Sequence, residues 1–201
     1  MSNGYEVLDL ESGRIVVQVA RQGLEQYVRF GETYRPELLG LPASLQEPGA
    51  SFVTLTNGGR LRGCIGHTQA KDPLAEDVVR NAAAASRDLR FAPIDPNELG
   101  NIRLEVTVLS PFQQLTYDNF NDLLDKLRPG IDGVMLTHSV KRALLLPQVW
   151  HRLPDKTQFL EAIAQKAGIP SRELRTSPPT IEVHVFQAQH FAEPGYQEPG
   201  N

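Results

Sequence analysis

Residues 51–66 read SFVTLTNGGRLRGCIG, and this stretch predicts a β-hairpin. Its first part, residues 51–56, is rich in the aromatic and β-branched side chains that favour strands. Residues 57–59, Asn-Gly-Gly, are a strong signal for a tight turn, because glycine accepts the positive φ angles of a hairpin loop. Residues 60–66 then return as the second strand. This hairpin is the clearest local feature of the chain.

The second strand of the hairpin holds the only cysteine of the chain, Cys64. Side chains alternate between the two faces of a strand. One face is expected to carry Leu61, Gly63 and Ile65, and the other Arg62, Cys64 and Gly66. The guanidinium offers five N–H donors, and the glycines let other atoms approach the backbone closely. We expect a central strand on which the thiol and the guanidinium share a face that a small polar or anionic group can reach.

The rest of the chain mixes helices with further strands. Helical spacing and capping signals predict helices over residues 11–30, 73–88, 119–127 and 155–167. Asp72 is the expected N-cap of the second helix. Alternating apolar residues predict strands over residues 102–109, 133–138, 143–146 and 180–191. Because no regular strand–helix–strand series is present, we expect an α+β fold of mainly antiparallel sheet packed with helices.

Composition excludes several classes of protein. The 201 residues are 40% hydrophobic and 22% charged, which is typical of a globular chain. The formal net charge of −4 argues against broad binding to a phosphate backbone. One cysteine cannot form an internal disulfide, and no apolar run approaches membrane-spanning length. The first eleven residues lack the pattern of a signal peptide, so we expect a cytoplasmic protein without a membrane partner.

Short segments follow one another in a recognisable order. The strongest are Phe52–Leu55, Gly59 and Leu61–Gly66. The supporting ones are Pro73-Leu74, Ala82–Ala85, Asp88 with Arg90-Phe91, Ile102 with Leu104–Val106, Leu146–Val149 and Lys166–Gly168. Together they resemble the AMMECR domain family over about residues 10–193. We expect this range to be one domain, and residues 194–201 to be a solvated tail.

The resemblance implies a fold of two subdomains with a cleft between them, beside the cysteine-bearing segment. Bacterial and archaeal members are often encoded beside a Memo-type protein and a radical-SAM protein, and this AmmeMemoRadiSam context implies a shared pathway. The chain departs from the family pattern in two places. Leu89 stands where the family often has proline, and the segment Trp150–Pro154 is more compact than its usual counterpart.

Three residues are candidates for catalysis: Cys64, His67 and Glu105. A catalytic thiol needs a base or a lowered pKa, but a free cysteine is more often a small buried side chain. Alternation directs His67 away from Cys64 unless Gly66 bends the strand. Glu105 lies in mid-strand as a general base or as the partner of an arginine.

The candidate ligand-binding residues are Arg62, Gly63, Cys64, Gly66, Arg90 and Gln148. The two guanidiniums suit bidentate binding of a carboxylate or phosphate. Their alternative is a structural ion pair with Glu105 or Asp88. Gln148 follows Pro147 at a strand end, where a polar side chain can point into a pocket or bond to a loop.

No cofactor is expected, and no metal site. The histidines are scattered at His67, His138, His151, His184 and His190, without metal-binding spacing.

The sequence leaves three classes of function open. The first is a pathway protein that binds a small polar ligand near Cys64, with enzyme activity left open. The second is a non-catalytic adaptor whose motif is structural. The third, which the charge disfavours, is nucleic-acid binding.

Overall fold

The computed structural model describes residues 8–176 and 178–199, and the chain divides into two compact units. The first unit contains the described residues up to Leu109 and those from Gln189 onward. The second contains the described part of Ser110–Ala188. Each unit has its own sheet, its own helices and its own apolar core. The expected α+β fold is confirmed.

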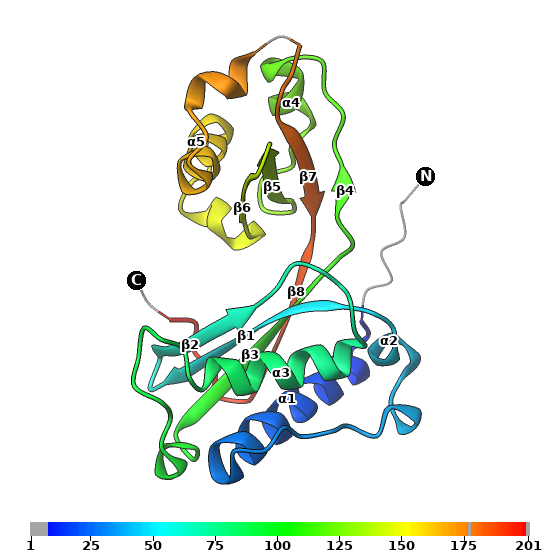
Figure 1. Ribbon diagram of the computed structural model, residues 1–201, viewed down its shortest axis with the longest axis vertical. Coiled ribbons are helices and arrows are strands. Elements are labelled where there is room, and N and C mark those ends of the chain that lie inside the picture. The colour runs from blue at the N-terminus through cyan, green and yellow to red at the C-terminus, as the bar shows by residue number, and fades with distance from the viewer. Residues whose placement is uncertain (1–7, 177, 200–201) are drawn as a thin grey trace. The chain divides into compact units, whose positions relative to one another are not determined.

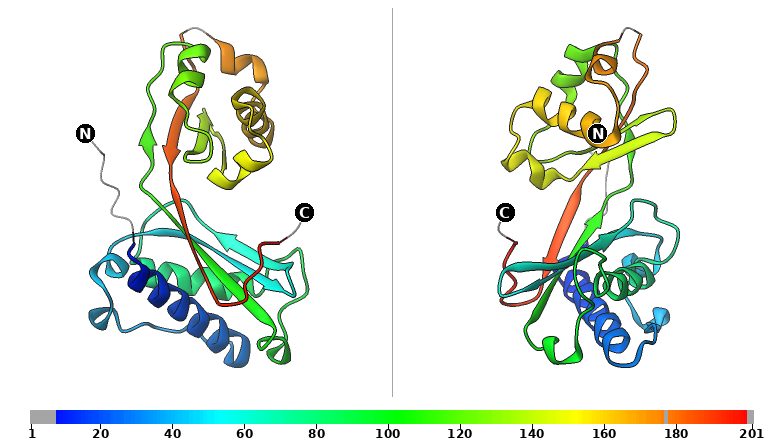
Figure 2. Two further views of the ribbon diagram at one scale, coloured as in Figure 1. Left: turned by 180° about the vertical axis from the view of Figure 1, so that it is seen from behind. Right: turned by 60° about the vertical axis from the view of Figure 1, so that its left-hand side comes forward.

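The sheet of the first unit has the strand order β2-β1-β3-β8 (Figure 1). Its strands are β1 (Ala50–Asn57), β2 (Arg60–Gly66), β3 (Ile102–Leu109) and β8 (Ala188–Ala192). Its helices are α1 (Leu10–Phe30), α2 (Ala43–Gln46) and α3 (Leu74–Ala85), with the short 3₁₀ turns η1 (Leu38–Gly40) and η2 (Pro96–Glu98). The long helices α1 and α3 cover one face of this sheet (Figure 2). Side chains on the other face of the sheet therefore belong to a separate surface.

The predicted hairpin of residues 51–66 is confirmed as β1 and β2. Gly58 and Gly59 have φ angles of 56° and 74°, and Asn57 pairs with Arg60 across the two-residue loop. Two positive φ angles in succession define the hairpin turn that matches the natural twist of paired strands. The turn residues therefore determine where β1 ends and β2 begins.

The first helix illustrates how capping sets its limits. Asp9 accepts a hydrogen bond from the backbone N–H of Ser12, and Gly31 ends the helix in the left-handed conformation. The buried side of α1 contains Val16, Ala20 and Leu24, all fully inaccessible to solvent. Across the interface, α3 contributes mostly alanine and valine, so the two helices pack closely together.

The second unit contains an antiparallel sheet of strand order β4-β7-β5-β6. Its strands are β4 (Gln113–Gln114), β5 (Gly133–His138), β6 (Lys141–Leu145) and β7 (Glu182–Phe186). Its helices are α4 (Phe120–Lys126) and α5 (Lys156–Ala167), with the 3₁₀ turns η3 (Pro147–His151) and η4 (Ser171–Arg175). Trp150 stacks on Phe159 with ring centroids 3.6 Å apart, and its indole N–H donates to the carbonyl of Asp132. This buried pair anchors η3 to α5 in the core.

Two local expectations were wrong. Asp72 is not the N-cap of α3: Pro73 occupies that position, and the Asp72 carboxylate accepts a hydrogen bond from Arg80 instead. Residues 180–191 do not form one strand. They form β7 in one sheet and the start of β8 in the other, with the break at Gln187. The backbone of Gln187 exchanges hydrogen bonds with Ser110, which holds the crossing point.

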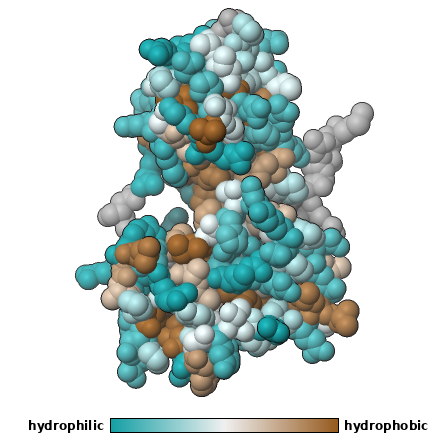
Figure 3. All heavy atoms as spheres, in the orientation of Figure 1, coloured by the Kyte–Doolittle hydropathy of each residue, from teal (hydrophilic) through white to brown (hydrophobic). Residues whose placement is uncertain are grey.

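Hydrophilic residues dominate the face shown in Figure 3, where apolar residues form small separate patches. The exposed large apolar side chains include Leu39 and Leu89. Among the described residues, no helix is long and apolar enough to cross a membrane.

Candidate functional site

Cys64 lies on an edge strand, because β2 is the first strand of its sheet. The expectation of a central strand was therefore wrong. The pairing of β1 with β2 shifts by one residue: Leu55 faces Gly63, the next residue Thr56 faces Leu61, and Arg62 is the extra residue of a β-bulge. The bulge breaks the strict alternation on which the shared face of Arg62 and Cys64 depended.

The side chains of Arg62 and Cys64 accordingly form hydrogen bonds with different partners. The Arg62 guanidinium donates to both carboxylate oxygens of Glu98 and to the carbonyls of Ala92 and Pro93. The thiol of Cys64 instead accepts a hydrogen bond from the Thr54 hydroxyl, with an oxygen–sulfur distance of 3.4 Å. Arg62 and the thiol therefore do not converge on one point.

Cys64 belongs instead to a row of polar side chains across the face of the sheet that α1 and α3 leave uncovered. Thr54 on β1 lies opposite Cys64 on β2 and also opposite Glu105 on β3. Directly opposite residues share a face, and adjacent strands lie about 4.8 Å apart. The thiol and the Glu105 carboxylate therefore project from the same surface, from strands about 10 Å apart with Thr54 between them.

His190 on β8 extends this row to the fourth strand. Its Nδ1 lies 3.2 Å from the Thr107 hydroxyl and 3.4 Å from Oε1 of Glu105. The side chain of Glu105 is 17% exposed and that of His190 is 31% exposed. We call Cys64, Thr54, Glu105 and His190 the polar row. Together they supply a thiol, a hydroxyl, a carboxylate and an imidazole to one partly shielded surface.

Tyr196, beyond β8, lies beside this row. Burial raises the pKa of its phenol, and the negative charges of Glu105, Glu198 and the ionised Cys64 raise it further. The phenol therefore stays neutral at physiological pH and can donate a hydrogen bond. In residues 194–199 of the predicted solvated tail, many residues are exposed, but Tyr196 is partly buried. Glu193, just before the tail, is held against the first unit by Arg21.

The second predicted arginine, Arg90, forms an ion pair with Asp88. The Asp88 carboxylate also accepts the backbone N–H of Cys64, at 2.9 Å, and Arg90 donates to the Cys64 carbonyl. The hydrogen bonds from Arg90 hold the pKa of Asp88 far below its usual range. In the same way, the hydrogen bonds from Arg62 lower the pKa of Glu98. Both arginines thus have structural partners, and their role in ligand binding stays a prediction.

The two glycines of the motif are required by internal packing. A Cβ added at Gly63 would overlap the carbonyl oxygen of Ala85 in α3. A Cβ at Gly66 would overlap the carbonyl oxygen of Ser51 and the ring of Phe52. Internal packing alone therefore explains why glycine occupies both positions, without any contact to a ligand.

The other two predicted residues lie elsewhere. His67 follows β2, and its Nδ1 lies 2.9 Å from Oδ1 of Asp77 in α3. Its role as a base for Cys64 stays a prediction. Gln148 lies in η3 of the second unit, and its role at the site stays a prediction. The residues that the structure describes contain no group of three or more histidine, cysteine, aspartate or glutamate side chains suited to a metal ion.

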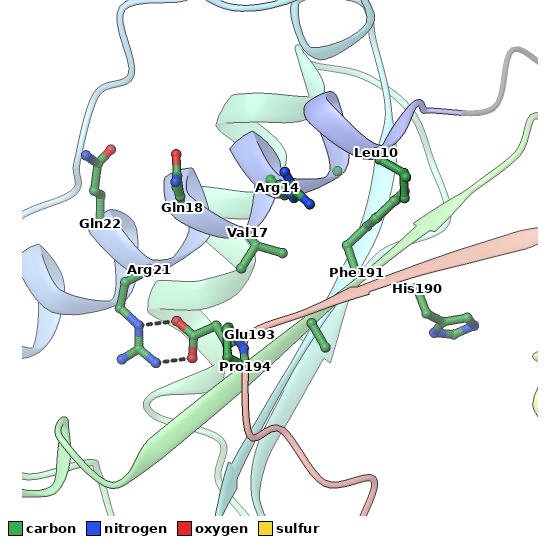
Figure 4. Close-up of a pocket in the computed structure, with 12 residues that line it drawn as sticks. Leu10, Arg14, Val17, Gln18, Arg21, Gln22, His190, Phe191, Glu193 and Pro194 are labelled. Atoms are coloured by element: carbon green, nitrogen blue, oxygen red, sulfur yellow. Dashed lines mark hydrogen bonds and ion pairs between the residues drawn. The ribbon is translucent and has the colours of Figure 1, made fainter.

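A cavity of about 740 Å³ lies between α1 and β8, and His190 of the polar row is among the residues that line it. Phe191 points toward α1 and lies over Gly13, whereas the neighbouring His190 points away from the helix (Figure 4). Arg21 of α1 forms a two-point hydrogen-bonded ion pair with Glu193 at the edge of this cavity (Figure 4). The two neighbouring residues of β8 thus point in opposite directions, Phe191 toward α1 and His190 away from it (Figure 4).

Sequence reasoning missed His190 and Tyr196. His190 lies in a predicted strand, but the sequence does not reveal that this strand joins the sheet of Cys64 next to β3. Tyr196 lies in a segment rich in glycine and proline, which gave no signal of burial.

The fold and site are those of a two-unit α+β protein with a cysteine-bearing edge hairpin. Residues 17–191 match the AMMECR1 family, and the chain belongs to it. A protein of Methanothermobacter thermautotrophicus is 37% identical over 198 residues, which cover 95% of this chain and 99% of that protein. A protein of Methanopyrus kandleri is 36% identical over 197 residues, covering 94% and 91%. The crystal structure of an uncharacterized protein from Pyrococcus horikoshii matches with a TM-score of 0.82 and 30% identity, covering 96% of this chain and 95% of that one.

Proposed function

We propose that this AMMECR1-family protein binds a small polar molecule on the polar row. The observation that carries the proposal is the position of Thr54, which faces Cys64 on one side and Glu105 on the other. Strands β2 and β3 are far apart in the sequence, yet their polar side chains meet on one surface. Half-buried polar groups that converge in this way are typical of ligand sites.

The groups on the row indicate the chemistry of the ligand. The Glu105 carboxylate accepts hydrogen bonds, and the hydroxyls of Thr54 and Tyr196 donate and accept them. The donors of Arg62 and Arg90 are bound to carboxylates inside the protein. This arrangement favours a polar ligand with hydroxyl or amino groups over a purely anionic one. Glu105 and His190 form the acid–base pair of the site, and Cys64 lines it.

The proposal keeps the pathway implied by the family resemblance, in which Memo-type and radical-SAM proteins act together with this one in the cytoplasm. Membership of the AMMECR1 family supports this link. Within it, this chain contributes ligand binding.

A thermal-unfolding screen with hydroxyl- and amine-bearing metabolites tests the proposal. A ligand at one hundred times its Kd stabilises by about 2.7 kcal/mol. For a chain of this size the midpoint then rises on the order of 5–10 °C. The rise should disappear in Glu105→Gln and His190→Gln and persist in Glu182→Gln, a control at an exposed glutamate of β7. Ligands that stabilise all variants equally, or no stabilising ligand at all, would favour the adaptor function instead.

A further inference from the structure

A second pocket lies where β2 ends and α3 begins. The loop after Gly66 and the first turns of α3 enclose a cavity of about 540 Å³. Its lining includes His67, Lys71, Asp72, Asp77 and Arg80. The volume is within the range of pockets that hold small molecules. This cavity contains none of the side chains of the polar row.

The centre of the pocket is a buried carboxylate that orients a histidine. Asp77 is 2% exposed. Its Oδ2 accepts hydrogen bonds from the Ser51 hydroxyl at 2.7 Å and from the Asn81 amide at 2.9 Å. Its Oδ1 lies 2.9 Å from Nδ1 of His67. The hydrogen bonds from Ser51 and Asn81 fix the orientation of the Asp77 carboxylate. The carboxylate in turn fixes the orientation of the His67 imidazole.

This bond determines what the imidazole presents to the pocket. An ionised carboxylate only accepts hydrogen bonds, so Nδ1 of His67 carries the proton that it donates to Asp77. The other nitrogen, Nε2, makes no hydrogen bond within residues 8–176 and 178–199. The imidazole is 49% exposed and lines the cavity. When the ring is protonated, Nε2 is an oriented donor that faces solvent.

The carboxylates around the pocket have partners within the protein, whereas one of its cationic side chains has none among the described residues. Asp72 accepts a hydrogen bond from Arg80 at 2.7 Å, Glu76 lies 3.7 Å from the same guanidinium, and both oxygens of Asp77 have partners. Lys71, by contrast, makes no hydrogen bond or ion pair in the part of the chain that the structure describes. Both oxygens of Asp77 and one oxygen of Asp72 therefore have partners inside the protein, while the ammonium of Lys71 and Nε2 of His67 bond to none of the residues that the structure describes.

We propose that this pocket binds the phosphate group of a small phosphorylated molecule, between Nε2 of His67 and the ammonium of Lys71. Arg80, held at the pocket by Asp72, adds positive charge. A cavity of about 540 Å³ is much larger than one phosphate group, so the remainder of the molecule has room beside it. This site is independent of the polar row and of the function proposed for it.

Binding should weaken as pH rises, because the imidazole must carry both protons to donate through Nε2. The groups that face His67 are Lys71, Asp72, Asp77 and Arg80, with Glu76 behind Arg80. Burial raises the pKa of the Asp77 carboxyl, and the Ser51 hydrogen bond and the charges of His67 and Arg80 oppose that rise. Sulfate is the useful probe, because its charge stays at −2 throughout this range. We expect sulfate affinity to fall several-fold from about pH 5.5 to about 8.5.

The experiment uses the full chain and imidazole ¹H–¹⁵N spectra, with the His67 signals assigned by His67→Gln. Inorganic phosphate and sulfate should shift these signals saturably, while acetate and chloride at equal ionic strength should not. Lys71→Met should weaken sulfate binding by about threefold or more, which is the effect of one partly exposed charge. Lys141→Met, at an exposed lysine of β6, should leave it unchanged.

Three results would overturn the proposal. The first is a shift that does not saturate, since this indicates only a change in ionic atmosphere. The second is equal affinity in the Lys71→Met and Lys141→Met proteins. The third is acetate binding as tight as that of sulfate, which would exclude the phosphate class. Lys71 is exposed and contacts no other side chain through a hydrogen bond, so loss of folding in Lys71→Met is not expected.

Discussion

Gly63 of β2 and Ala85 of α3 lie so close together that a Cβ at Gly63 would overlap the Ala85 carbonyl oxygen. The obstacle is backbone, which cannot rotate away. Gly63→Ala should therefore lower the free energy of unfolding by about 1–3 kcal/mol, the usual cost of overpacking. Urea unfolding measures this loss. Gly100→Ala is the matched control, because an added Cβ there meets nothing within 4 Å.

Cys64→Ser provides the comparison at the neighbouring residue. Serine is close in size to cysteine, and its hydroxyl can keep the bond to Thr54 at this half-buried position. We expect a loss below about 1 kcal/mol, within the range of one neutral hydrogen bond. Equal losses for Gly63→Ala and Cys64→Ser would show that α3 can move away from β2.

The elements that local chemistry specifies were predictable. Asn57-Gly58-Gly59 predicted the turn because both glycines adopt positive φ. Gly31 at the end of α1, and Asp155 and Gly168 at the two ends of α5, cap those helices in the structure. In each case the signal lies within a few residues of the feature, so no knowledge of the tertiary fold was needed.

Features that depend on strand pairing were not predictable. The β-bulge at Arg62 separates the Arg62 side chain from the Cys64 thiol. The bulge is visible only in the pairing register of β2 with β1, and no residue type in the sequence marks it. Glu105 was a candidate from its polar position in mid-strand, but its place opposite Thr54 required the sheet order. His190 required knowing that the final strand is divided between two sheets.

Asp88 should contribute to stability against acid. Because its folded pKa is depressed by Arg90, the unfolded chain binds more protons than the native one over this range. The contribution is fully present above the ordinary aspartate pKa of about 3.9 and is lost as pH falls toward the lower folded value. Asp88→Asn should lose about 1.5–3 kcal/mol at neutral pH, typical of hydrogen bonds to a charged group.

Urea unfolding at a series of pH values from about 7 to about 3 measures this difference. The Asp88→Asn and wild-type curves should approach each other as pH falls. Asp125→Asn, at an exposed aspartate of α4, is the control and should follow the wild-type curve. A constant gap between wild type and Asp88→Asn across the series would show that the aspartate acts by packing rather than by charge.

Glu193 should anchor the segment after β8. Its carboxylate binds Arg21 through both oxygens and accepts the backbone N–H of Leu104 at 3.0 Å. Glu193→Gln should destabilise the first unit by about 1.5–3 kcal/mol, since a charged hydrogen-bonded pair becomes a neutral one. Hydrogen exchange at Leu104 and Tyr196 should report the local loosening. Glu198→Gln, at an exposed glutamate of the same segment, should leave exchange at Leu104 unchanged.

Cys64 should react slowly with iodoacetamide in the native protein. A reactive thiol needs a neighbouring base or cation that stabilises the thiolate. Here the sulfur accepts one hydrogen bond from Thr54, and His67 is bonded to Asp77 instead. Mass spectrometry from about pH 5 to about 9 should show labelling that rises only at high pH or on unfolding. His67→Gln should label at the wild-type rate. Rapid labelling near pH 6 that is lost in Glu105→Gln or His190→Gln would contradict this expectation and make the thiol a nucleophile served by the polar row.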